Sequence, residues 1–82
     1  DNELLNECKN MMIGIVKNIN KDLSLHDFRM VTGPSHTNLI FDLVVPHDCK
    51  LNEKDIKTAI NDSLKDKEIK YYTVITFERE FC

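Results

Sequence analysis

The chain has 82 residues, with 11 Lys and Arg against 14 Asp and Glu, and a formal net charge of −3. A chain of this length forms one domain that buries about 60% of its unfolded surface, so its core is marginal and a partner that covers apolar surface would stabilise it. The acidic balance offers no basic field to a phosphate backbone, which argues against nucleic acid as a ligand. The longest apolar run, residues 11–16, falls far short of the about 20 residues that cross a bilayer. We expect a single domain over residues 1–82 that is not itself inserted in a membrane.

Residues 3–20 predict an amphipathic helix, because apolar side chains recur there at steps of three and four residues. The stripe consists of Leu4, Leu5, Cys8, Met11, Met12, Ile15, Val16 and Ile19. Gly14 lies within this stretch and weakens a helix by up to about 1 kcal/mol relative to alanine. We therefore interpret Gly14 as a point where the helix packs closely on a sheet.

Residues 23–32 and 36–45 predict two strands, since apolar and polar side chains alternate in both. The first strand is expected to place on one side His26, Phe28 and Met30, and on the other Leu25, Asp27, Arg29 and Val31. The second is expected to have one face of Leu39, Phe41, Leu43 and Val45, and another of Asn38, Ile40, Asp42 and Val44. The turn at Gly33-Pro34-Ser35 is short, so the two strands should form an antiparallel hairpin that ends at Pro46.

Residues 52–67 predict a second helix, and residues 71–78 a third strand. Asn52 is the expected N-cap, and Glu53 and Asp55 suit the positive end of the helix dipole. The apolar stripe of this helix consists of Ile56, Ala59, Ile60 and Leu64. The third strand alternates Tyr71, Thr73, Ile75 and Phe77 with Tyr72, Val74, Thr76 and Glu78.

The order α-β-β-α-β predicts an α+β fold, a ferredoxin-like two-layer sandwich with a mainly antiparallel three-stranded sheet and both helices on one face. The expected core is Phe28, Met30, Leu39, Phe41, Leu43, Ile75 and Phe77. If the third strand pairs beside the first, the crossover through the second helix should be right-handed.

The opposite face of the sheet is half apolar. It carries Ile40, Val44, Tyr72 and Val74 beside Asp27, Arg29 and Asp42. A face of this kind in a small domain is typical of a protein interface. The sequence therefore predicts a homodimer with an interface that includes Ile40, Val44, Tyr72 and Val74.

The cysteines and the loop after Pro46 indicate neither a disulfide framework nor catalysis. Cys8, Cys49 and Cys82 are odd in number and lack C-x-x-C spacing, which favours a reducing cytosol. The segment His47-Asp48-Cys49 contains three types of metal donor, and Cys82 could join them. Three adjacent side chains do not point at one ion, so we expect this segment to be a solvated loop. No nucleophile with a base and oxyanion hole is recognisable, and no phosphate-binding loop, so we expect no enzyme.

Several short patterns occur in the order found in a known domain. They are His26-Asp27-Phe28-Arg29, Gly33-Pro34, Phe41-Asp42, Val44-Val45-Pro46 and Val74-Ile75-Thr76. With the leading helix, they make essentially the whole chain resemble the cytoplasmic C-terminal domain of the cation diffusion facilitator family, exporters of zinc, iron and manganese. The resemblance implies a metallochaperone-like, ferredoxin-related fold, a V-shaped homodimer and a preceding six-helix membrane domain. Since the chain begins at Asp1, we expect it to be a fragment of such a cell-membrane protein.

The resemblance also implies a metal site, which this chain keeps only in part. Metal-binding members have histidines on the first strand, late in the second strand and at the start of the second helix, and a His-x-Asp on the last strand. In this chain His26 corresponds to the histidine of the first strand, and Asp42 is the nearest counterpart of the histidine in the second strand. The last strand has Ile75-Thr76-Phe77-Glu78 in place of the His-x-Asp motif, so Glu78 is the candidate ligand there. An ion that prefers oxygen ligands would suit this set; otherwise the domain pairs without metal. The alternative for His26 is a strand histidine hydrogen-bonded at the sheet edge or dimer seam.

These expectations combine into one function and one alternative. The chain would be the cytosolic dimerisation and regulatory domain of a divalent-cation efflux transporter, acting on its own transmembrane domain and sensing zinc, manganese or iron between two copies if metal regulates it. The alternative is a free-standing ferredoxin-like binding or sensor module, or a soluble metallochaperone, although the paired cysteines expected for soft-metal transfer are missing.

Overall fold

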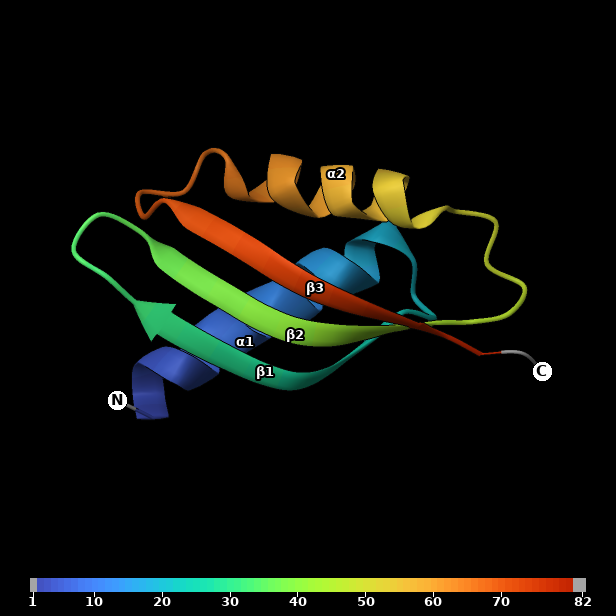
Figure 1. Ribbon diagram of the computed structural model, residues 1–82, viewed down its shortest axis with the longest axis horizontal. Coiled ribbons are helices and arrows are strands. Elements are labelled where there is room, and N and C mark those ends of the chain that lie inside the picture. Colours follow the sequence, from blue (N-terminus) through green and yellow to red (C-terminus); the bar gives the residue numbers. More distant parts are fainter. Residues whose placement is uncertain (1, 81–82) are drawn as a thin grey trace.

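The computed structural model describes residues 2–80 and confirms the predicted order of elements. They are α1 (Asn2–Ile19), β1 (Ser24–Thr32), β2 (Thr37–Val45), α2 (Glu53–Leu64) and β3 (Tyr71–Arg79). Both helices pack against one side of the three-stranded sheet and contact each other, and α1 passes behind the strands in Figure 1. The α+β two-layer fold class is thus confirmed. None of the helices in residues 2–80 has the length and apolar character of a membrane span.

Helix α1 buries one stripe and leaves Gly14 on its outer side. Cys8, Met12 and Val16 are buried against the rest of the protein. A Cβ built on Gly14 would meet nothing within 4 Å, so the prediction of a close approach at this glycine was wrong. At about 100° per residue, Gly14 points about 200° away from both Met12 and Val16, which places it on the solvent side.

Helix α2 begins as the sequence predicts. The side chain of Asn52 caps it by accepting a hydrogen bond from the backbone N–H of Asp55 at 2.8 Å. Ile56, Ile60 and Leu64 are buried, so the predicted stripe faces the core. The helix ends at Leu64, a few residues earlier than predicted, and a turn closed by Lys65 N–H to the Asp62 carbonyl follows.

The sheet has the order β1-β2-β3, with β2 in the centre. β1 and β2 are antiparallel, as the short turn predicts, whereas β2 and β3 are parallel. The sheet is therefore mixed, and β3 lies beside β2 rather than beside β1. A crossover through a helix returns the chain in the same direction, which explains the parallel pairing.

Strand β1 contains a bulge that changes which side chains face the core. His26 pairs with Asp42, but the next paired residue is Arg29 with Ile40, so Asp27 and Phe28 share one place opposite Phe41. Asp27 has a φ of 53°, a left-handed conformation typical of such a bulge. Because the extra residue shifts the alternation, Leu25 packs on the core and His26 is exposed. The predicted side assignment was wrong for these two residues.

The core lies between the helices and the inner side of the sheet. Its buried members are Met12, Val16, Leu23, Leu39, Phe41, Leu43, Val45, Ile56, Ile60 and Leu64. The other predicted core residues, Phe28, Met30, Ile75 and Phe77, are half-buried and pack against this cluster. Phe28 stacks on Phe41 with ring centroids 6.1 Å apart, so the bulge itself is anchored in the core. The predicted core is confirmed.

Candidate functional site

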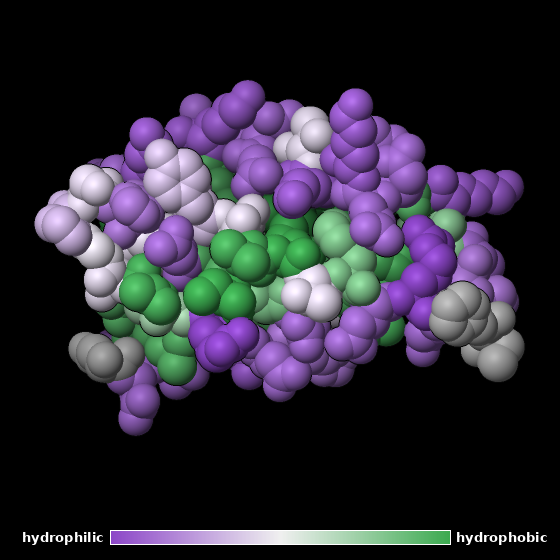
Figure 2. Space-filling view, viewed as in Figure 1, coloured by the Kyte–Doolittle hydropathy of each residue, from purple (hydrophilic) through white to green (hydrophobic). Residues whose placement is uncertain are grey.

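The candidate site is the open face, the side of the sheet turned away from the helices. The strand register arranges its side chains in four rows: Val31, Asn38 and Tyr72; Arg29, Ile40 and Val74; His26, Asp42 and Thr76; Ser24, Val44 and Glu78. Figure 2 views this face and shows green, apolar side chains across its middle with purple, hydrophilic ones around them. The face is thus neither uniformly polar nor covered by another element of residues 2–80.

The apolar strip, defined here as Val31, Ile40, Tyr72 and Val74, occupies the first two rows. Val31 is 54% exposed, Tyr72 46% and Val74 55%, and Ile40 is half-buried between its neighbours. Three of the residues predicted for a dimer interface therefore lie together. Val31 was not among the predicted interface residues, although its position on the outward side of β1 could have indicated that it belongs to this surface.

Val44 lies apart from the apolar strip, although it shares the open face. It pairs with Ser24 on one side and Glu78 on the other. The row of His26, Asp42 and Thr76 separates it from Ile40 and Val74. The predicted interface residues consequently form one compact group and one outlying member.

The open face has charges of opposite sign at its two ends. Beside Tyr72, the Nζ of Lys70 lies 5.4 Å from the ring centroid, a cation–π contact. The ring of His36 meets the same tyrosine edge-on at 4.8 Å between centroids. At the other end, the third and fourth rows carry Asp42 and Glu78. The apolar strip therefore lies between a basic end and an acidic region.

The predicted metal ligands share the open face but do not form a site within one chain. His26 lies opposite Asp42, and Glu78 lies one row further along β3. The Nε2 of His26 is 3.2 Å from the Ser24 hydroxyl. Across residues 2–80, no three His, Cys, Asp or Glu side chains are grouped so that they could hold a metal ion. A site built from these residues would need ligands from a second chain.

A shallow cavity of about 420 Å³ lies at the bulge, lined by Asp27, Phe28, Arg29 and Asp42. Two carboxylates are attractive to a cation, but the guanidinium of Arg29 borders the same space and opposes it. The bulge therefore adds an aspartate to the acidic region without assembling a cation site.

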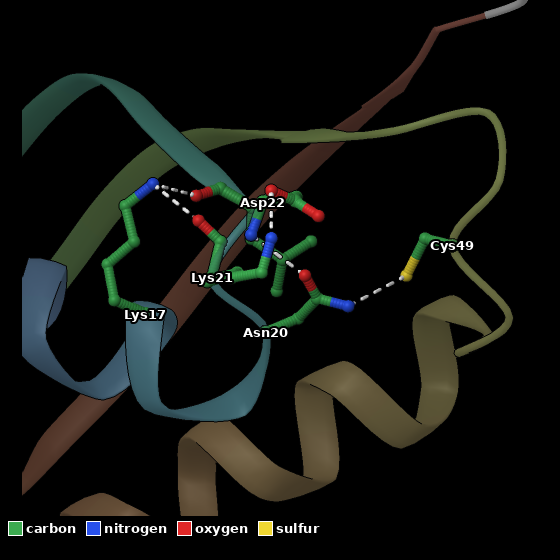
Figure 3. A network of polar contacts seen from close by, with 6 residues as sticks. Lys17, Asn20, Lys21, Asp22 and Cys49 are labelled. Atoms are coloured by element: carbon green, nitrogen blue, oxygen red, sulfur yellow. Dashed lines mark hydrogen bonds and ion pairs between the residues drawn. The ribbon is translucent and has the colours of Figure 1, made fainter.

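The loop after Pro46 is held by hydrogen bonds from the side chains of Asn20 and Arg79. His47 and Asp48 are exposed, whereas Cys49 is half-buried, and its Sγ lies 3.7 Å from the Asn20 side-chain nitrogen (Figure 3). Arg79 also binds this loop, with its guanidinium donating to the carbonyls of Pro46, Cys49 and Leu51 at 3.3–3.4 Å. The expected solvated loop is confirmed for His47 and Asp48. Cys82 lies outside the described residues.

The end of α1 is tied to the start of β1 by a polar network, which Figure 3 shows. Lys17 Nζ donates to the carbonyls of Lys21 at 3.0 Å and Leu23 at 2.7 Å. The N–H of Asp22 donates to the Asn20 side-chain oxygen at 2.8 Å. These bonds satisfy carbonyls in the connection and hold α1 against the sheet, so the network is structural.

Cys8 and Tyr71 form a contact between α1 and the sheet. The Sγ of Cys8, which is buried, lies 3.9 Å from the Tyr71 hydroxyl. Burial, and then the contact with Cys8, raises the pKa of Tyr71 above its ordinary value. A raised tyrosine pKa favours the neutral phenol, so this pair acts as a packing contact at neutral pH.

Comparisons of the chain with protein-family models, curated proteins and solved structures found no match.

Proposed function

We propose that the domain pairs with a second copy through its open face and serves as the cytosolic dimerisation and regulatory domain of a divalent-cation efflux transporter of the cation diffusion facilitator type. The observation that supports the pairing is the exposed apolar strip. The helices cover only the other face of the sheet. Covering such a strip removes apolar surface from water, which favours association.

The shape of the molecule suits an interface on this side. The principal extents are 41 × 23 × 18 Å, and Figure 1 looks down the shortest of them onto the sheet. A stable protein interface buries about 800 Å² on each partner. The broad side that contains the open face is large enough for this without any rearrangement of the helices.

Charge complementarity favours a second copy of this chain as the occupant. A two-fold axis that lies in the interface, perpendicular to the strands and through the apolar strip, stacks one strip on the other. The same rotation brings the basic end of each copy, at Lys70, toward the acidic region of its partner, at Asp42. Each copy thus supplies both halves of the charge pairing, and this pairing selects an antiparallel arrangement of the strands.

The regulatory role follows from attachment of each copy to a membrane domain. The α-β-β-α-β order and the His26-Asp27-Phe28-Arg29 strand support the resemblance from which this attachment is inferred. Pairing can shift the attached membrane domains between access states only if the free energy of dimerisation differs between those states. In this arrangement the domain pairs without metal, because Asp42 has a lysine as its partner.

The experiment that tests the pairing is a molar-mass measurement by light scattering, in chelator and again with a modest excess of zinc or manganese. We expect twice the chain mass of 9.6 kDa in both conditions. Val74→Glu should give the monomer, because it places a charge in the apolar strip, whereas Thr58→Glu on the exposed side of α2 should remain dimeric. A monomer throughout would refute the pairing. A metal-dependent mass would instead place an ion between the copies, at His26, Asp42 and Glu78.

A second candidate, a free-standing binding or sensor module, is favoured by a different feature. A cavity of about 560 Å³ lies between the end of α2 and the start of β3. The metallochaperone alternative has less support, since Cys8 is buried against Tyr71 and Cys49 contacts Asn20.

A further inference from the structure

The cavity between α2 and β3 has the size of a small-molecule site. It is closed on one side by the last turn of α2, on another by the loop of residues 65–70, and on a third by the start of β3. Its volume of about 560 Å³ falls within the range of roughly 300–1,000 Å³ that is common for ligand pockets. The open face is a separate surface, which meets the cavity at Lys70 and Tyr72.

The apolar lining includes surface that the protein leaves in water. Leu64 is buried at the wall that α2 forms, with 4% exposure. Ile69 and Tyr72, which also line the cavity, are each 46% exposed. A ligand that covers these two side chains would gain hydrophobic free energy without displacing a protein element.

The rim is basic in a chain that is acidic overall. Lys65, Lys67 and Lys70 line the cavity with a single acid, Glu68. Lys65 is engaged with Asp62 at 2.9 Å, and this hydrogen bond and charge raise its pKa. Within residues 2–80, Lys67 and Lys70 form no ion pair. These two ammonium groups are therefore available to an anion.

A polar group on the opposite wall adds a donor. Thr73 Oγ1 donates to the side-chain oxygen of Asn61 at 2.9 Å, which fixes the orientation of that amide. The amide nitrogen of Asn61 then remains as a donor at the cavity. The lining thus combines apolar surface with donors and cations, the combination that recognises a molecule with an apolar body and an anionic group.

We propose that this cavity binds a small apolar molecule that carries one anionic group, such as a carboxylate. The apolar body would cover Ile69 and Tyr72, and the anionic group would interact with Lys67 and Lys70. The lining comes from a single chain. In the paired arrangement proposed above, Lys70 and Tyr72 also face the second copy, so Lys67 and Ile69 are the contacts that belong to the cavity alone.

The test is an NMR titration of the ¹⁵N-labelled chain with octanoate, and with octanol as the uncharged counterpart. We expect saturable shifts for octanoate concentrated at residues 61–73, and weaker binding of octanol. The double variant Lys67→Gln/Lys70→Gln should lose about tenfold or more in octanoate affinity, because charge-assisted hydrogen bonds are lost. The matched variant Lys54→Gln/Lys57→Gln, at the start of α2 and outside the lining, should bind as the unaltered chain does.

Three outcomes would overturn the proposal. One is the absence of saturable shifts with octanoate. Another is equal binding of octanol and octanoate, which would remove the anionic requirement. The third is a set of shifts centred on Val31, Ile40 and Val74, which would show that the probe covers the open face instead. Ile69→Ser provides an independent check, since it should weaken octanoate binding while leaving both lysines in place.

Discussion

His26 lies directly opposite Asp42 on the open face of the sheet, and the bulge at Asp27 is the reason. In a strand that alternated without interruption, His26 would share a side with Phe28 and Met30, which pack on the core. The extra residue rotates His26 outward and lets Leu25 take the inner position. One residue in a left-handed conformation therefore decides that the histidine belongs to the candidate interface.

The left-handed conformation of Asp27 predicts how this position responds to substitution. Asp27→Gly should be tolerated, because glycine adopts positive φ without steric cost. Asp27→Val should lower the free energy of unfolding by roughly 1–2 kcal/mol, since a β-branched residue is strained there. Urea denaturation measures both. His26→Val, one residue earlier, is the control and should have a much smaller effect; equal losses at the two positions would contradict the role of the bulge.

Gly14 and Gly33 should respond differently to alanine. Gly14→Ala should raise the free energy of unfolding by up to about 1 kcal/mol, because the new methyl group meets open space and alanine favours the helix. At Gly33 a Cβ would lie 3.2 Å from the carbonyl oxygen of His36, which also accepts the Gly33 N–H at 2.9 Å. Gly33→Ala should therefore give no gain. Thermal and urea unfolding of the two variants test this contrast, and destabilisation by Gly14→Ala would mean that this side of α1 is covered.

The raised pKa of Tyr71 predicts that the protein loses stability at high pH. Burial and the contact with Cys8 raise the pKa of Tyr71 in the folded state above its ordinary value of 10.0. Its contribution is fully present below the unfolded pKa, and it is lost as pH rises through the folded pKa, because the unfolded state releases its proton first. The free energy of unfolding should thus fall less steeply above pH 10 in Tyr71→Phe than in the unaltered chain. Parallel slopes for the two proteins would exclude this contribution.

The charge pairing between copies can be tested by exchange of its partners. Lys70→Glu and Asp42→Lys should each weaken the dimer, by about thirtyfold if each of the two symmetry-related exposed pairs contributes about 1 kcal/mol. The double variant Lys70→Glu/Asp42→Lys should recover the dimer, because each copy then presents the reversed pair to the other. Sedimentation equilibrium at low salt measures the three constants. If the double variant is no tighter than the singles, the proposed two-fold orientation is wrong.

Local patterns in the sequence determined the elements of this protein. The three- and four-residue spacing of Cys8, Met12 and Val16 identified α1, the side chain of Asn52 identified the start of α2, and the alternation of Leu39, Phe41 and Leu43 identified the central strand. Each of these signals acts within a few residues along the chain. For that reason the helices, strands and most of the core could be read before the structure was known.

Tertiary structure alone decided how these elements meet. The position of β3 beside β2 depends on pairing between residues far apart in sequence, such as Ile40 with Val74, which brings the apolar strip together. The cavity beside Ile69 exists only because α2 ends at Leu64 and the chain returns to the sheet edge. The bulge was also decided by tertiary structure: alternation along the sequence placed Leu25 and Phe28 on opposite sides of a regular strand, and only pairing with β2 showed that both face the core because Asp27 is the extra residue. Periodicity specifies which side of its own element a residue occupies, whereas register and strand order specify what lies across from it.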